Sequence, residues 1–237
     1  MKERVINVIK LLISFLIFFN IGYILLFILG LFNKNMNNIG DKTLVLLEFI
    51  ISLIIFIISL LLYYKEFKKD YKEFKKNIEN KIWYILKMFV VFMVVKYIVS
   101  FMSLLILELL GMDIESLSSV NQNTINEYAK INPILVALIA SFIGPIYEEI
   151  IFRLGIKKVV RNKYLFIVFS GLIFGLLHIF PLDENISLTL GLIQSISYVT
   201  MGIFLAYIYE KKKNIFYSIG LHILNNLLGI LSIIGMM

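Results

Sequence analysis

Cysteine is absent from the 237 residues of this chain, and proline occurs only three times. Without cysteine there is no disulfide, no thiolate nucleophile and no cysteine-ligated metal. The near-absence of proline and of serine-rich stretches leaves no room for a long flexible linker. The HExxH, GxSxG and Walker motifs are also missing, which excludes the zinc hydrolases, serine hydrolases and nucleotide-binding proteins that carry them.

Hydrophobic residues, by contrast, make up 60% of the chain, and the mean hydropathy is +0.90. A soluble domain is about 45–50% apolar, so this composition indicates a membrane protein. We expect an all-α, polytopic membrane helix bundle that forms a single integral membrane domain over residues 1–237. Residues 1–133 would hold the N-terminal spans and loops, and residues 134–235 a core that carries the polar motifs.

About 20 mostly apolar residues are needed for a helix to cross a bilayer. Stretches that meet or nearly meet this length predict about seven transmembrane helices, at residues 5–32, 43–64, 82–111, 134–156, 164–180, 186–209 and 214–235. The first apolar stretch is too long for a signal-peptide core of about 7–15 residues, and no small-residue cleavage site follows it. We therefore expect it to be retained as the first span.

Basic residues set the expected orientation. With the N-terminus inside, 16 Lys and Arg residues fall in inner loops and ends, against 3 in the outer loops. This asymmetry predicts a cytoplasmic N-terminus and a C-terminus outside, in a bacterial plasma membrane. The net charge of +7 is then explained by contact with the lipid bilayer, and we expect no nucleic-acid partner.

The inner loop 65–81 contains a tandem repeat, YKEFKKD followed by YKEFKKN. Its aromatic residues recur three and four positions apart, which predicts a basic amphipathic helix at the anionic inner surface. A solvated, charged connector is the alternative. The outer loop 112–133 is polar and mildly acidic, and its length suits a small cap or a substrate-contacting element.

Ionisable residues inside apolar spans are rare and usually functional. The fourth predicted span contains PIYEEIIFR, in which Glu149 and Arg153 lie four residues apart and can pair on one helix face. Glu148 lies about 100° away around the helix, so it is available to face a cavity. A snorkelling Arg153 neutralised by Glu149 would explain that pair without any function, but not Glu148. Gly144 and Pro145, one turn earlier, are expected to loosen the backbone.

Both histidines of the chain also lie in apolar segments. His178 shares a helix face with Phe174, four residues earlier, and His222 shares one with Asn226, four residues later. A lone buried histidine is often a satisfied core residue, and an asparagine can simply join helices by hydrogen bonds. Glycines at 171 and 175 on the segment of His178 predict a close helix approach.

A carboxylate beside an imidazole can hold and deprotonate a water molecule. An imidazole and a side-chain amide can donate hydrogen bonds to an oxyanion. Together these groups suit hydrolysis of a carbonyl compound such as a peptide bond. Alternatively, Glu148, His178 and His222 could bind zinc, which would activate the same water.

The three motifs resemble those of the CPBP family, the CAAX protease and bacteriocin-processing group of intramembrane proteases. EEIIFR is similar to EExxxR, FGLLH to FxxxH and HILNN to HxxxN, in the family's order, and the resemblance covers roughly residues 134–235. One departure is Leu154, where many members have glycine.

The resemblance implies an intramembrane endopeptidase that cuts membrane-associated peptide or protein substrates, lipidated or not. Glu148 would activate water with help from His178, while His222 and Asn226 would stabilise the oxyanion. Glu149, Arg153 and Phe174 would support the site. We favour a mechanism without a cofactor, because the sequence has no dedicated metal motif, and zinc stays the alternative.

A non-catalytic membrane protein is the second hypothesis. It would be a transporter, or an immunity or partner-binding protein built on the same scaffold. Transporters usually show repeated halves with broken helices at matching positions, and this sequence shows no such internal symmetry. A binding protein would tolerate loss of Glu148, whereas an enzyme would not.

Overall fold

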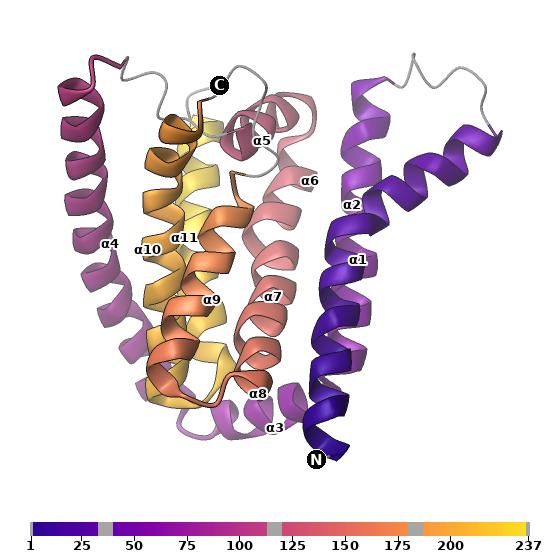
Figure 1. Ribbon diagram of the computed structural model, residues 1–237, viewed down its shortest axis with the longest axis vertical. Coiled ribbons are helices and arrows are strands. Elements are labelled where there is room, and N and C mark those ends of the chain that lie inside the picture. Colours follow the sequence, from indigo (N-terminus) through magenta and orange to yellow (C-terminus); the bar gives the residue numbers. More distant parts are fainter. Residues whose placement is uncertain (1, 33–39, 113–119, 180–186, 236–237) are drawn as a thin grey trace. The chain divides into compact units, whose positions relative to one another are not determined.

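The computed structural model describes residues 2–32, 40–112, 120–179 and 187–235, and all regular structure in these ranges is helical (Figure 1). The elements, in chain order, are α1 (Lys2–Phe32), α2 (Asp41–Leu62), α3 (Tyr64–Lys75), α4 (Ile78–Leu109), α5 (Val120–Ile131), α6 (Pro133–Leu138), η3 (Ile139–Ile143), α7 (Gly144–Glu149), η4 (Ile150–Gly155), α8 (Ile156–Val159), α9 (Lys163–Leu177), α10 (Leu188–Lys212) and α11 (Ile215–Gly235). The expected all-α membrane bundle is thereby confirmed.

The predicted spans coincide with helices, but one of them is short. Six stretches of the described chain are long and apolar enough to cross a membrane. The fifth predicted segment, 164–180, forms α9, whose 15 residues extend about 22 Å at 1.5 Å per residue. The helix ends at Leu177 because the chain turns at His178. Residues 180–186, where we expected the fifth span to end and the sixth to begin, lie outside the described residues.

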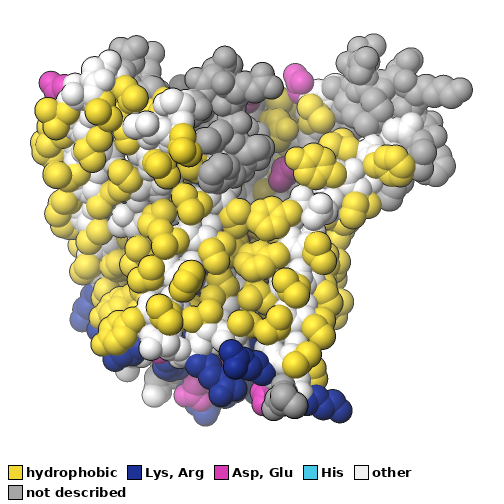
Figure 2. All heavy atoms as spheres, viewed as in Figure 1, with side chains coloured by type: hydrophobic (Ala, Val, Ile, Leu, Met, Phe, Trp, Pro, Cys, Tyr) yellow, Lys and Arg dark blue, Asp and Glu magenta, His cyan; other side chains and the backbone are white. Residues whose placement is uncertain are grey.

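Hydrophobic side chains cover the visible helix faces, and the visible Lys and Arg side chains gather near one end of them (Figure 2). Helix α4 is typical, with large apolar side chains exposed along its length: Trp83, Val90, Val91, Val94, Tyr97, Ile98 and Phe101. Water would oppose such exposure, whereas the hydrocarbon layer of a membrane accommodates it. The helices are therefore those of an integral membrane protein.

The chain divides into two compact units. The first comprises residues 1–69, 126–159 and 222–237, and the second comprises residues 70–125 and 160–221. Helices α3, α5 and α11 each contribute to both units.

In the first unit, α1 and α2 pack beside each other and against the segment from α6 to α8. Ile55, Tyr147 and Ile151 form a buried apolar cluster there, and aromatic residues of α1 such as Phe15 and Phe18 pack against it. Lys10, although within an apolar span, donates a hydrogen bond to the carbonyl of Leu62 at 2.7 Å. This packing holds the segment that carries the paired glutamates.

The second unit is built around the close packing of α9 and α10. A Cβ atom added at Gly175 would lie 2.3 Å from Val199 Cγ2 and 2.4 Å from the Val199 backbone nitrogen. At Gly171 it would lie 2.4 Å from Ile203 Cγ1. Only glycine permits this approach, which confirms the contact predicted from these two residues.

The basic repeat forms a helix, α3, as predicted, but a shorter one than expected. Asn77 takes a left-handed conformation with φ of 52°, which asparagine tolerates better than most residues. The turn separates α3 from α4, which therefore begins at Ile78 rather than at residue 82. The outer loop expected at 112–133 contains helix α5, and its residues 113–119 lie outside the described residues.

Asp70 connects α3 to the start of α11. Its carboxylate accepts a hydrogen bond from the backbone N–H of Ile215 at 2.9 Å, and its carbonyl accepts one from the Asn214 side chain at 2.8 Å. An anion at a helix N-terminus satisfies exposed N–H groups and favours the helix dipole. Asp70 therefore acts as a cap supplied from another helix.

Candidate active site

The paired glutamates lie on a helical segment with π-helical turns on both sides. Glu148 and Glu149 end α7, between η3 and η4. In η3 the N–H of Gly144 donates to the carbonyl of Ile139, five residues earlier. The loosened backbone expected at Gly144 and Pro145 is thus a π-turn. Such turns are rare and often occur at functional sites.

Glu149 and Arg153 form a buried ion pair, as predicted from their spacing. Arg153 Nε lies 3.0 Å from Glu149 Oε2, and both side chains are fully buried. The partner charge and the hydrogen bond stabilise Glu149 as a carboxylate in an apolar setting, where an isolated charge would be costly.

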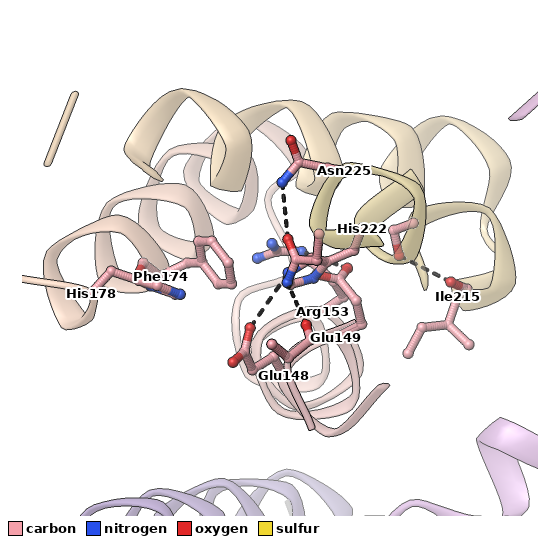
Figure 3. A network of polar contacts seen from close by, with 11 residues as sticks. Glu148, Glu149, Arg153, Phe174, His178, Ile215, His222 and Asn225 are labelled. Carbon is pink, nitrogen blue, oxygen red and sulfur yellow. Dashed lines mark hydrogen bonds and ion pairs between the residues drawn. The ribbon is translucent and has the colours of Figure 1, made fainter. Parts of the chain in front are cut away.

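His222 connects this pair to Glu148 (Figure 3). Its Nδ1 lies 3.2 Å from Glu149 Oε1, and its Nε2 lies 3.6 Å from Glu148 Oε2. Because a carboxylate can only accept, Nδ1 carries the hydrogen and donates it to Glu149. Nε2 is then the ring nitrogen that faces Glu148. His222 therefore lies between the two glutamates.

The four side chains of this contact series are not equally buried. Glu149 and Arg153 are fully buried and His222 is nearly so, whereas the Glu148 side chain is 15% exposed. Glu148 is thus the accessible end of the series Arg153–Glu149–His222–Glu148. The buried members hold the imidazole in one orientation, in the way that a buried acid orients the histidine of a catalytic triad.

Asn226 takes part in two hydrogen bonds within the first unit. Its Nδ2 donates to the carbonyl of Ala140 at 2.8 Å, and its Oδ1 accepts from Asn225 Nδ2 at 2.9 Å. Both amides, that of Asn225 and that of Asn226, are thus engaged in hydrogen bonds within the first unit. One of the two Nδ2 hydrogens of Asn226 is used by Ala140.

His178 belongs to the second unit and has a different environment. Its Nδ1 lies 2.7 Å from the carbonyl of Phe174, so Nδ1 carries the hydrogen and Nε2 is the acceptor of the neutral ring. The ring packs 4.5 Å from that of Phe174 and stacks on Tyr198, with centroids 4.7 Å apart and planes 20° apart. The shared face predicted for Phe174 and His178 is confirmed.

Three features of this arrangement were missed from the sequence. His222 was paired with Asn226 alone, but it lies against both glutamates. Tyr198, on α10, stacks on His178 although it belongs to none of the three motifs. The carbonyl of Ala140 is a backbone group without a residue signature. Spacing along one helix predicts neighbours on that helix and is silent about contacts between helices.

The positions of the donor side chains bear on metal binding. Among the described residues, no group of three or more His, Asp or Glu side chains gathers as a metal site would require. Glu148 and His222 are nevertheless residue types that bind zinc. His222 would have to bind through Nε2, because its Nδ1 donates to Glu149.

Fold and site together define a polytopic helical membrane protein with a buried glutamate–histidine centre. Residues 130–228 match the family model described as type II CAAX prenyl endopeptidase, Rce1-like. This range contains all three motifs, and the match confirms the family resemblance inferred from them.

The chain is also similar to a bacterial protein. Over 118 residues the chain is 30% identical to the UPF0177 protein YvdC of Lactococcus lactis subsp. lactis (strain IL1403). The alignment covers 49% of this chain and 42% of that relative, so it spans less than half the length of either protein. No solved structure matches the chain.

Proposed function

We propose that this protein is an intramembrane endopeptidase that hydrolyses peptide bonds of membrane-associated substrates through a water molecule activated by Glu148. The observation that carries the proposal is the contact of Glu148 with His222, whose ring is held by the buried pair of Glu149 and Arg153. The match of residues 130–228 to a family of prenyl endopeptidases supports the same reaction class.

In the proposed mechanism, the Glu148 carboxylate takes a proton from water as the water oxygen attacks the scissile carbonyl carbon. The carbon–nitrogen bond of the tetrahedral intermediate then breaks, and the same proton passes to the leaving amine. His222 Nε2 lies close enough to Glu148 to share this proton. Glu149 and Arg153 keep a hydrogen on Nδ1 throughout, so Nε2 becomes a donor when it holds the shared proton.

The other predicted roles are proposals that rest on the family resemblance. His178 would help to hold the water, and its Nε2 is the acceptor nitrogen suited to that task. His222 and Asn226 would donate to the oxyanion, for which Asn226 has a second Nδ2 hydrogen. The substrate would be a peptide or protein at the membrane, such as a bacteriocin precursor or a lipidated C-terminus. We also propose the cytoplasmic N-terminus in a bacterial plasma membrane.

Comparison of wild-type protein with Glu148→Gln tests the proposal. Membranes of cells that produce each form are compared by mapping new protein N-termini. We expect cleavage products in the wild type that fall by about 10²–10⁴-fold in the variant, the range for loss of a general base. Glu108→Gln is the matched control, because Glu108 is an exposed carboxylate at the end of α4.

Full cleavage by folded Glu148→Gln protein would contradict an enzymatic role for Glu148 and would favour the partner-binding alternative. The zinc alternative needs a separate test on purified protein. Zinc would lower the pKa of a bound water and so supply the nucleophile. Activity that survives metal-free purification and strong chelation would exclude it.

A further inference from the structure

The backbone of η3 leaves one carbonyl without its usual donor. Gly144 donates to Ile139, five residues earlier, so it is not the donor for Ala140 that an α-helix would supply. The next donor in the π-helical register would be residue 145, which is a proline and has no N–H. Neither the α-helical nor the π-helical register therefore supplies a backbone donor for the Ala140 carbonyl.

Asn226 of α11 supplies that donor. Its Nδ2 lies 2.8 Å from the Ala140 oxygen, and the hydrogen bond from Asn225 to Asn226 Oδ1 orients the amide. In an apolar layer an unsatisfied backbone group costs several kcal/mol. This hydrogen bond therefore satisfies the carbonyl that the π-turn leaves without a backbone donor.

The position of the turn determines the position of Glu148. Side chains on a helix lie over the turn that precedes them, and a Cβ atom at Gly144 would lie 3.8 Å from Glu148 Oε1. The same Cβ would lie 3.1 Å from the Ile139 oxygen. The Glu148 carboxylate thus rests against the π-turn that Asn226 holds.

We propose that Asn226 is a positioning residue that fixes the π-turn before Glu148 by holding the Ala140 carbonyl. It acts through the backbone of η3 and does not need to touch the reacting atoms. The catalytic consequence rests on the proposed function, whereas the hydrogen bond itself can be measured without substrate.

The four alanines of the chain make the Ala140 carbonyl directly observable. Ala140–Ser141 is the sole Ala–Ser pair in the sequence, so labelling alanine carbonyl carbons with ¹³C and serine nitrogens with ¹⁵N identifies one NMR signal. In Asn226→Leu, a substitution of similar volume without a donor, we expect this signal to move upfield. An unchanged signal in folded Asn226→Leu protein would overturn the proposal.

Asn20→Leu is the matched control. Asn20 also donates its Nδ2 to a backbone carbonyl, that of Leu16 at 2.9 Å, but on an exposed face of α1. This variant should leave the Ala140 signal at its wild-type position. A comparable movement in Asn20→Leu would show that the signal does not report the Asn226 contact, and would count against the proposal.

A measurement on wild-type protein covers the case in which Asn226→Leu does not fold. With asparagine side-chain nitrogens labelled with ¹⁵N, dipolar coupling should reduce the Ala140 carbonyl signal in solid-state NMR, because the nitrogen lies 2.8 Å from the carbonyl oxygen. Absence of this dephasing in lipid bilayers would overturn the proposal.

Activity separates a positioning role from an oxyanion role. We expect Asn226→Leu to lower kcat by about 100-fold, the size associated with a small misplacement of catalytic groups, together with the upfield shift. A lower kcat with an unchanged Ala140 signal would instead indicate a direct oxyanion donor. If the wild type cleaves nothing, the proposed function fails while the NMR result still decides the role of Asn226.

Discussion

His222 and His178 are both held through Nδ1, but their acceptors differ in charge. Glu149 accepts from His222 and is itself paired with Arg153, whereas a backbone carbonyl, that of Phe174, accepts from His178. Both partners place a hydrogen on Nδ1. The orientation of His222 therefore depends on charged side chains, and that of His178 depends on a backbone group.

The two imidazole rings also differ in their surroundings, which are charged for His222 and aromatic for His178. His222 is buried among charged side chains, and its orientation depends on an ion pair. His178 is half-buried between aromatic rings on α9 and α10, and its orientation depends on glycine-mediated packing. Removing a charge of the ion pair should therefore affect the His222 ring, and disrupting the packing of α9 against α10 should affect the His178 ring.

The largest effect is expected from Arg153→Met. Removing the guanidinium leaves Glu149 buried without its partner, and such changes cost about 3–5 kcal/mol. We expect that loss of unfolding free energy, measured by reversible detergent unfolding in mixed micelles. Lys76→Met, which breaks the exposed pair with Glu73, should change stability by about 1 kcal/mol or less. Equal losses of unfolding free energy in the two variants would show that the buried pair stabilises the fold no more than the exposed pair does.

Gly175→Ala should disturb the packing of α9 against α10, which positions His178. The new Cβ would overlap Val199 on α10, and overpacking of this kind costs about 1–3 kcal/mol. Gly229→Ala is the control, since nothing lies within 4 Å of a Cβ at that position on α11. We expect no loss of unfolding free energy in the control, and equal behaviour of the two variants would contradict the close contact of α9 with α10.

Tyr198→Leu should have a smaller effect. It removes the ring that stacks on His178, and aromatic pairs contribute about 0.5–1.5 kcal/mol beyond area burial. Tyr198→Phe keeps the ring and should retain the contribution of the stacking contact with His178. Labelling the two histidines with ¹⁵N provides a second measurement. The imidazole signals of His178 should change in Tyr198→Leu, while those of His222 should remain in place.

The smallest effect is expected at Glu66, whose carboxylate lies 2.7 Å from Lys158 Nζ. Burial by itself raises the pKa of Glu66, but the hydrogen bonds and positive charges around it, chiefly from Lys158, outweigh burial and lower it below its ordinary value of 4.5. The pair therefore stabilises the fold at neutral pH, and this contribution is lost as the pH falls through the lowered pKa.

Because both side chains are partly exposed, the contribution should be about 1 kcal/mol or less. We expect Glu66→Gln to unfold slightly more readily than wild type at pH 7 and to differ less from it in acid. A larger difference in acid than at pH 7 would contradict the direction of the pKa shift.

Local spacing was sufficient for part of the site. The pairs Glu149–Arg153 and Phe174–His178 each lie four residues apart on one helix, and both contacts are present. Helical geometry alone requires such residues to be neighbours. The link from His222 to the glutamates, 73 residues away in sequence, could not be predicted because it depends on how α11 packs against α7.

The class of the protein was determined by the sequence itself. Long apolar stretches predict membrane-crossing helices, because a helix satisfies its own backbone hydrogen bonds within the lipid layer. Charged residues inside these stretches indicate a functional site. The tertiary structure alone decided that His222 joins Glu148 to Glu149, that Asn226 holds Ala140, and that Tyr198 stacks on His178. Each of these contacts joins different helical elements, and their relative register depends on packing between helices, which no local pattern encodes.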